Sequence, residues 1–284
     1  MSNVITVRQQ GLDKFYTKPE IVDKCIMELH EYYKFNNFDL IIEPSAGNGN
    51  FLLKLPKNKR IGIDIEPDNT YTKEIIKQDF LTFLPKQVEN ILTIGNPPFG
   101  KICSLAIKFF NHSAKFSNVI AFIIPKTFRK ISIQNKLDLN FHLVHDSDIP
   151  NNPCSFEPNM SVKCCFQIYT RKDIKRNIIL QPITHKDFEF LQFGLKDANN
   201  QPTPPITNNL TDFAIRAYGG KCGEIKLLDL NELRPKSWHF IRSKIDKNIL
   251  IHKFNKLDYS KSENTARQNS LGKAELVNLY TNSE

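Results

Sequence analysis

The segment that most constrains this chain is Ile91 to Gly100, which reads ILTIGNPPFG. Its apolar first half, up to Ile94, predicts a buried strand. The two prolines that follow cannot donate to a sheet ladder and fix their own φ angles, so the strand must end before them. The break holds the amide of Asn96 and the ring of Phe99 at the carboxyl end of a strand, where open α/β sheets bind ligands. Taken alone, the segment is equally consistent with a proline turn after a core strand.

A second strand-and-loop segment lies upstream, Leu40 to Phe51, and reads LIIEPSAGNGNF. Its apolar start leads into Glu43 and a loop with Gly47 and Gly49, where glycines let the backbone approach a ligand closely. The residues after the loop, Asn50 to Leu55, are expected to start a helix beneath it. The loop lacks the third glycine of the GxGxxG dinucleotide motif, and a carboxylate here would repel a pyrophosphate. A carboxylate beside a glycine loop is better suited to a ligand with a positive ammonium group.

Strand, acid, glycine loop and helix, followed by a strand ending in NPPF, resemble the S-adenosylmethionine-dependent amino-methyltransferases, most closely the adenine-N6 DNA methyltransferases. The resemblance extends from Phe15 to Tyr169. It implies an α/β fold with a Rossmann-like seven-stranded class I methyltransferase sheet, and S-adenosyl-L-methionine as the cofactor. The catalytic residues that it implies are Asn96, Pro97, Pro98 and Phe99.

These residue types suit the chemistry of an exocyclic amine, whose lone pair is delocalised into the ring. The side-chain oxygen of Asn96 and the backbone carbonyl of Pro97 would accept its hydrogens and so localise the lone pair. Phe99 would stack on the target ring, and the nitrogen would attack the sulfonium methyl in line without a covalent enzyme intermediate. A base in duplex DNA would first have to be flipped out of the stack.

The resemblance also assigns cofactor contacts outside the glycine loop. A TxPE-type helix start at residues 17–20 places Tyr16 and Thr17 near the methionine part. Asp64, at the end of the strand predicted for residues 60–65, can accept both ribose hydroxyls, with Glu66 as the competing candidate. The full cofactor-binding set is Tyr16, Thr17, Glu43, Pro44, Ser45, Ala46, Gly47, Gly49, Asp64, Ile65 on the adenine face, Asp79 at the adenine amino group, Phe80 beside the ring, and Asn96.

Hydrophobic periodicity predicts the rest of this region. Helices are expected over residues 105–114 and 126–137, and strands over residues 118–124, 140–146 and 161–169. Seven strands interleaved with helices then make a parallel sheet that ends in a hairpin. The loop over residues 150–160, rich in proline and asparagine, is expected to be irregular. Phe156 within it is a candidate second aromatic wall for a flipped base; the alternative is that it anchors the loop.

The chain is expected to change character near residue 175. Residues 1–174 are assigned to the catalytic domain, and residues 175–284 to a smaller α/β target-recognition region. In the second region, residues 201–209 suggest a linker, residues 212–225 a strand, a tight glycine turn and a strand, and residues 272–280 a short helix.

Charge points to a polyanionic partner for this second region. The formal net charge is +9, and residues 171–284 hold 19 Lys and Arg against 13 Asp and Glu. Basic residues interleaved with aromatics suit a nucleic-acid surface, and Arg216, Lys221 and Arg242 are the candidate phosphate or base-edge contacts. A solvated charged face is the alternative reading of the same pattern.

Nothing in the sequence predicts a metal site or a membrane span. None of the six cysteines forms a CxxC, and His142 and His145 lie in a strand-like stretch that would point them to opposite faces. No apolar run approaches the roughly 20 residues of a transmembrane helix, and the start lacks a signal-peptide pattern. A cytoplasmic protein is expected, bacterial or viral within an infected cell.

The leading hypothesis is a site-specific DNA adenine-N6 methyltransferase, with a cognate restriction endonuclease as a separate chain if it belongs to a restriction–modification pair. The family often has tyrosine at the position of Phe99. A phenylalanine here is consistent with either DNA or RNA as the substrate. The alternatives are an RNA adenosine-N6, a cytosine-N4 or a protein-glutamine N5 methyltransferase. A third class, a non-catalytic nucleic-acid-binding module, is opposed by the intact NPPF segment and glycine loop.

Overall fold

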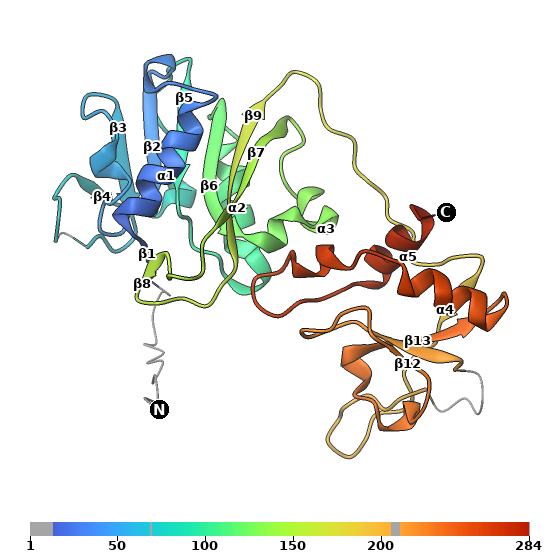
Figure 1. Cartoon of the computed structure of the whole chain (residues 1–284). Helices are drawn as coiled ribbons and strands as arrows, with labels where there is room; N and C mark the ends of the chain where they lie inside the picture. Colours follow the sequence, from blue (N-terminus) through green and yellow to red (C-terminus); the bar gives the residue numbers. More distant parts are fainter. Residues whose placement is uncertain (1–13, 69, 206–210, 284) are drawn as a thin grey trace. The chain divides into compact units, whose positions relative to one another are not determined.

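The computed structural model describes residues 14–68, 70–205 and 211–283. The chain divides between Ile178 and Ile179 into two compact units, called here the N-terminal and the C-terminal unit (Figure 1). Residues 1–13 and part of the expected linker over residues 201–209 lie outside the described residues.

A seven-stranded sheet forms the centre of the N-terminal unit, in the order β4-β3-β2-β5-β6-β9-β7. All neighbours pair in parallel except β9, which runs antiparallel between β6 and β7 (Figure 1). The expected α/β fold, a Rossmann-like sheet closed by a hairpin, is confirmed. The strands are β2 (Leu40–Pro44), β3 (Arg60–Asp64), β4 (Ile75–Lys77), β5 (Ile91–Gly95), β6 (Val119–Pro125), β7 (Phe141–Ile149) and β9 (Cys164–Arg171).

Helices cover both faces of this sheet. In α2 (Ser104–Ser113), Ala106 and Phe110 are buried in a core with alternate residues of β6 and β9. The other helix, α1 (Pro19–His30), buries Val22, Cys25 and Leu29. Its Glu28 accepts hydrogen bonds from His145 and Ser147 of β7. Since side chains of a strand alternate between faces, the two helices lie on opposite sides.

Two predicted helices are wrong in detail. The segment expected as one helix over residues 126–137 is a 3-10 turn, Lys126–Arg129, followed by the short α3 (Ile131–Gln134). Lys130 between them is extended, which breaks the helix. Below the glycine loop there is a single 3-10 turn, Leu52–Lys54. It stops there because Leu55 precedes a proline, which disfavours the helical region.

The C-terminal unit is a smaller α/β fold, as expected. Its antiparallel sheet, in the order β10-β13-β11-β12, packs one face on two helices, and Phe188, Phe213, Phe254 and Tyr280 are buried between them. Of the strand, tight turn and strand predicted within residues 212–225, the first strand and a turn are confirmed, but the turn is longer than a tight glycine turn and the second strand begins only at Ile225. The elements are β10 (Phe188–Phe190), β11 (Phe213–Arg216), β12 (Ile225–Lys226), β13 (Trp238–Ser243), α4 (Lys247–Asn255) and α5 (Lys273–Thr281).

The helix α4 was not expected from its polar, lysine-rich sequence. Asp246 caps it by accepting hydrogen bonds from the backbone N–H groups of Asn248 and Ile249, at 2.9 and 3.0 Å. Leu250 and Phe254, four residues apart, supply its buried stripe. In the described part of the chain, no helix has the length and apolar character that crossing a membrane requires.

The half-buried His239 of β13 should make the C-terminal unit sensitive to acid. Burial lowers the pKa of His239 from 6.5 to about 4, although its Nε2 lies 2.8 Å from the Leu271 carbonyl. The unfolded chain therefore binds a proton that the folded chain does not, so stability falls as pH is lowered through this window. At about 1.36 kcal/mol per pKa unit, we expect a loss of roughly 3 kcal/mol, measured by urea unfolding.

The variant His239→Gln should remove most of this pH dependence, because glutamine cannot take up the proton. His252→Gln, at an exposed position of α4, is the matched control and should keep the dependence of the parent. A parent whose unfolding midpoint is the same at both ends of the window would contradict the prediction.

Candidate active site at the carboxyl edge of the sheet

The glycine loop and the NPPF segment meet at one edge of the sheet. Parallel pairing of β2 with β5, with Ile42 opposite Thr93, brings the two strand ends side by side. Gly95 has a φ of +153°, and a Cβ there would lie 3.2 Å from Cγ of Glu43. The two motifs that are distant in sequence therefore share one site at the topological switch point of the sheet.

Asn96 is oriented by a backbone carbonyl. Its Nδ2 donates to the carbonyl oxygen of Phe15 at 3.2 Å. Because a carbonyl can only accept, this bond fixes which end of the amide faces the site. The opposite atom, Oδ1, is buried without a hydrogen-bond partner. Pro97 is buried beside it, while Pro98 and Phe99 are half-buried.

A short two-stranded sheet holds the Phe15 carbonyl in place. β1 (Tyr16–Thr17) pairs antiparallel with β8 (Phe156–Glu157), from the loop between β7 and β9. The backbone N–H of Lys18 donates to the Ser155 carbonyl at 3.0 Å, and Nδ2 of Asn50 donates to the Thr17 carbonyl at 2.7 Å. Three distant segments thus close this side of the site.

Phe156 belongs to this small sheet, directly opposite Thr17. It is 1% exposed, so its ring is packed into the protein. This arrangement fits the role of an anchor for the loop, the alternative to an aromatic wall for a flipped base.

Glu43 is a buried carboxyl at the end of β2. It is 3% exposed, and its Oε2 has no hydrogen-bond partner. Burial raises the pKa of Glu43 well above its usual range, opposed by a hydrogen bond from the Leu52 backbone. A buried carboxylate of this kind calls for a positive partner.

Unsatisfied oxygens gather at this one edge. Buried polar atoms normally have a partner. Among the described residues, the buried side-chain N and O atoms without one are Thr17 Oγ1, Glu43 Oε2 and Asn96 Oδ1. Their segments are joined by the contacts given above. The edge is therefore built for a ligand with donors and a positive charge.

The glycine loop is fastened to the next strand by Asp64. Its Oδ2 accepts from the Gly47 backbone N–H and its Oδ1 from that of Glu66, both at 2.8 Å. Gly47 has a φ of +55°, and a Cβ on it would lie 2.8 Å from the ring of Tyr16. Only glycine fits there, because the ring of Tyr16 covers the loop. Burial chiefly, with neighbouring carboxylates, raises the pKa of Tyr16 to about 12.

The two candidate ribose acceptors differ in their surroundings. Asp64 is 8% exposed, and each of its carboxylate oxygens accepts one backbone hydrogen bond, from Gly47 or from Glu66, which leaves further lone pairs. Glu66 forms a 2.9 Å ion pair with Lys14, and its side chain is 64% exposed. Ile65 between them is 51% exposed, an apolar surface beside the loop.

Asp79 and Phe80 lie further along the same edge. Asp79 accepts from the Leu81 backbone N–H at 2.9 Å and caps the 3-10 turn Phe80–Thr82. Phe80 is 2% exposed and contacts the rings of Phe109 and His112, both at 5.1 Å. In this structure Phe80 is a core residue.

The candidate nucleic-acid contacts lie in the C-terminal unit, and two of them have acidic partners. Arg216 pairs with Glu224 at 2.9 Å, and Arg242 lies 3.5 Å from Glu189. Lys221 is exposed in the turn between β11 and β12.

Sequence analysis missed three contributors to the site: Lys14, the carbonyl of Phe15, and Asn50. The sequence cannot indicate the role of the Phe15 carbonyl, since every residue has a backbone carbonyl. Asn50 was predicted only to start a helix, although an amide directly after a glycine loop is suited to a hydrogen bond with a distant segment of the chain.

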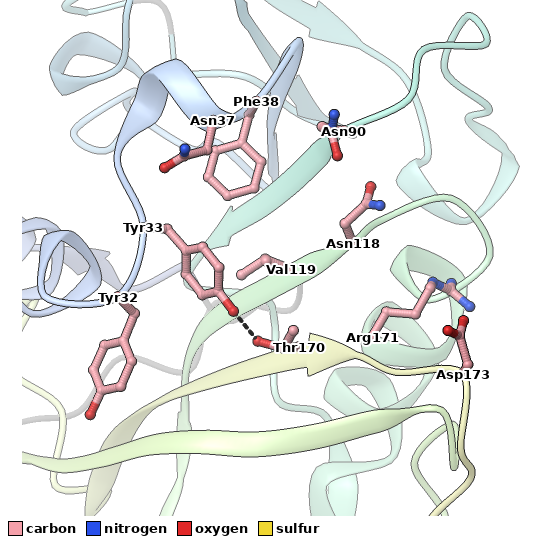
Figure 2. A pocket seen from close by; sticks show the side chains of 10 residues that line it. All are labelled: Tyr32, Tyr33, Asn37, Phe38, Asn90, Asn118, Val119, Thr170, Arg171 and Asp173. Carbon is pink, nitrogen blue, oxygen red and sulfur yellow. Dashed lines mark hydrogen bonds between the residues drawn. The ribbon is translucent and has the colours of Figure 1, made fainter.

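A recess of about 540 Å³ lies at the opposite, amino edge of the sheet (Figure 2). Asn90 and Asn118 line it just before β5 and β6 begin. Several of its polar groups already have hydrogen-bond partners in the protein: the Tyr33 hydroxyl lies 2.6 Å from that of Thr170, and Arg171 donates to the Ser117 carbonyl at 3.0 Å. This recess is not the candidate active site.

No protein-family model matches the sequence. The curated proteins likewise contain no match to it.

Solved structures resemble the chain in fold. The 23S rRNA methyltransferase ErmE has a TM-score of 0.43 and 16% identity, over 57% of this chain and 71% of that one. A dimethyladenosine transferase from Plasmodium falciparum has a TM-score of 0.40 and 19% identity, over 56% and 63%. Magnesium protoporphyrin IX methyltransferase from Synechocystis PCC 6803, with bound SAM, has a TM-score of 0.37 and 12% identity, over 54% and 79%. At these identities the likeness concerns the fold alone.

Proposed function

We propose that this protein is an S-adenosylmethionine-dependent methyltransferase that methylates N6 of adenine in DNA. One observation carries the proposal: Asn96 Oδ1 is buried, unpartnered and oriented by the Phe15 carbonyl, directly before the Pro97 carbonyl. Two neighbouring uncharged acceptors suit an amine that donates one hydrogen bond through each of its two hydrogens. They also match the NPPF resemblance.

The residues around the glycine loop fit S-adenosylmethionine. Glu43 offers a buried carboxylate for its ammonium, and the unpartnered Thr17 Oγ1 offers a contact to the methionine part. Asp64 lies where ribose hydroxyls are held in nucleoside-binding α/β folds, and the exposed Ile65 offers an apolar surface to adenine. When bound, this cofactor supplies a methyl group on a positively charged sulfur.

The chain's own groups would then prepare the target amine. Asn96 Oδ1 and the Pro97 carbonyl each accept one N–H of the adenine amine, which shifts its lone pair from the ring onto nitrogen. The ring of Phe99 stacks on the base and sets its orientation. With the cofactor bound, the N–C bond would form as the S–C bond breaks, and the nitrogen would then lose its extra proton to solvent. Fixed geometry of this kind lowers the barrier by removing the need for reorganisation.

The C-terminal unit is proposed to recognise the target. It carries an excess of basic residues, and duplex DNA is a dense polyanion. If the protein belongs to a restriction–modification pair, the nuclease would be a separate chain.

The test is transfer of tritiated methyl groups from S-adenosylmethionine to duplex DNA, total RNA and protein in parallel, followed by nucleoside mass spectrometry. We expect N6-methyladenine in DNA only. Label in RNA would replace DNA by RNA as the substrate. Label in protein, or as N4-methylcytosine, would replace adenine as the target, and binding of the cofactor without any transfer would refute the enzyme assignment.

A further inference from the structure

The turn of the β11–β12 hairpin, residues 217–223, reads AYGGKCG and lies at the surface of the C-terminal unit. A Cβ built on Gly220 would meet no atom within 4 Å, so this position of the turn borders open space. Tyr218 is 46% exposed, and Lys221 is exposed beside it. An aromatic ring and an ammonium group are thus both exposed on one turn, three residues apart in sequence.

The base of this turn is held by the rest of the unit. The backbone N–H of Gly219 donates to the Asn269 carbonyl at 3.0 Å, and that of Gly223 to the Arg216 carbonyl at 2.9 Å. The backbone N–H of Leu271 donates to the Ala217 carbonyl at 2.8 Å. Gly223 lies so close to the ring of Tyr259 that a Cβ would overlap it. A tip anchored at several points loses little freedom on binding.

Arg216, at the end of β11, supports the turn. Its guanidinium lies 2.9 Å from the Glu224 carboxylate and 5.5 Å from the centre of the Trp238 ring, and its Nε donates to the Tyr218 carbonyl at 3.4 Å. These contacts occupy the guanidinium and hold the backbone beneath Tyr218. We therefore assign Arg216 a positioning role in place of the DNA contact expected from sequence.

We propose that the tip of the β11–β12 hairpin enters the major groove of duplex DNA, where Tyr218 reads base edges and Lys221 contacts the flanking phosphate. The inference rests on the proposed function, which makes DNA the ligand, and it names the part of the C-terminal unit that recognises the DNA sequence. The major groove of B-DNA admits a two-stranded β-ribbon, and tyrosine there offers both a hydroxyl and an apolar ring. The deep, narrow major groove of an RNA duplex excludes such a ribbon.

The experiment compares the full-length protein with the variants Tyr218→Ala, Lys221→Ala and Lys247→Ala, the last an exposed lysine at the start of α4. Sequencing of N6-methyladenine across a methylated plasmid gives the sequence context of each variant. Fluorescence anisotropy at several salt concentrations gives the affinity for duplex DNA that carries this sequence context, for random-sequence duplex DNA and for the corresponding duplex RNA. Thermal unfolding shows that each variant is folded.

We expect Tyr218→Ala to methylate adenine in a wider range of flanking sequences. Its affinity for duplex DNA that carries the parent's target sequence should fall by about tenfold or more. Lys221→Ala should weaken DNA binding in all contexts and reduce the slope of log K against log salt by about 1. Lys247→Ala should behave as the parent. Arg216→Lys should resemble a milder Tyr218→Ala and lower thermal stability as well, because lysine cannot make the three guanidinium contacts.

A parent-like context and affinity in both Tyr218→Ala and Lys221→Ala would overturn the inference, as would tighter binding of the parent to duplex RNA. Failure of the proposed function looks different. If the parent transfers no methyl group, yet duplex DNA binding depends on Tyr218 and Lys221 and not on Lys247, the hairpin reads DNA in a protein that is not this enzyme.

Discussion

Replacing Asn96 by alanine is expected to lower kcat for methyl transfer by at least about a hundredfold, and to leave the affinity for S-adenosylmethionine nearly unchanged. The buried Oδ1 is the acceptor that would localise the amine lone pair, and alanine removes it. Turnover is measured with saturating DNA, and cofactor affinity by isothermal titration calorimetry. The separation of the two effects distinguishes a catalytic group from a structural one.

Two further variants sharpen this test. Asn90→Ala removes an amide at the other end of the same strand, β5, and should leave turnover at the parent level. Asn96→Asp keeps an oxygen, but a carboxylate cannot donate to the Phe15 carbonyl, so activity should fall here too. If Asn96→Ala transfers methyl groups at the parent rate, the catalytic assignment of NPPF is wrong.

Replacing Glu43 by glutamine should weaken binding of the cofactor and stabilise the free protein. Loss of the buried carboxylate removes a charge-assisted contact to the ammonium of the cofactor, worth about 1.5–3 kcal/mol, so Kd should rise about 10- to 100-fold. In the free protein the same change removes an unpaired buried acid. The free energy of unfolding at neutral pH should therefore rise by about 1 kcal/mol or more.

The pH dependence has a defined sign for each quantity. Burial raises the pKa of Glu43, so between the unfolded and the folded pKa the folded state binds the extra proton, and stability falls as pH rises through this window. The ammonium of the cofactor favours the ionised carboxyl. Its affinity should therefore increase with pH until the raised pKa of the free protein is passed. Glu43→Gln should show neither trend.

Glu89→Gln, at an exposed position before β5, is the control and should match the parent in cofactor affinity and in unfolding. Urea unfolding and calorimetry over a range of pH measure both quantities. A variant Glu43→Gln that is less stable than the parent and binds the cofactor equally well would show that the carboxyl serves the fold, and not the ligand.

Much of the central sheet was predictable because its strands are buried on both faces. Runs such as Ile91 to Ile94 are apolar without alternation and end at glycine or proline, so both their type and their carboxyl ends are evident. The site follows from these ends, since Glu43 lies at the end of β2 and Asn96 directly follows the adjacent β5. The order of two motifs along the chain was enough to place them together.

What the sequence could not predict depends on contacts between distant segments. Nothing near Phe15 shows that its carbonyl orients Asn96, because the pairing partner of β1 lies in a loop that reads as irregular. Phe80 was expected to face adenine, yet it is packed in an aromatic core with Phe109, which periodicity places on α2 without saying what it touches. Arg216 was predicted to contact nucleic acid because its partners, Glu224 and Trp238, contact it only in the folded hairpin and sheet.

The pairing of β1 with β8 has a consequence for the order in which the protein becomes active during synthesis. Thr17 and Phe156 are register partners although most of the N-terminal unit lies between them in sequence. Closing so long a loop comes late in folding, after local contacts and the neighbouring parallel strands. A nascent chain that has released the NPPF segment but not yet β8 would hold Asn96 without its orienting carbonyl. The proposed methyl transfer would thus begin only when synthesis of the N-terminal unit is nearly complete.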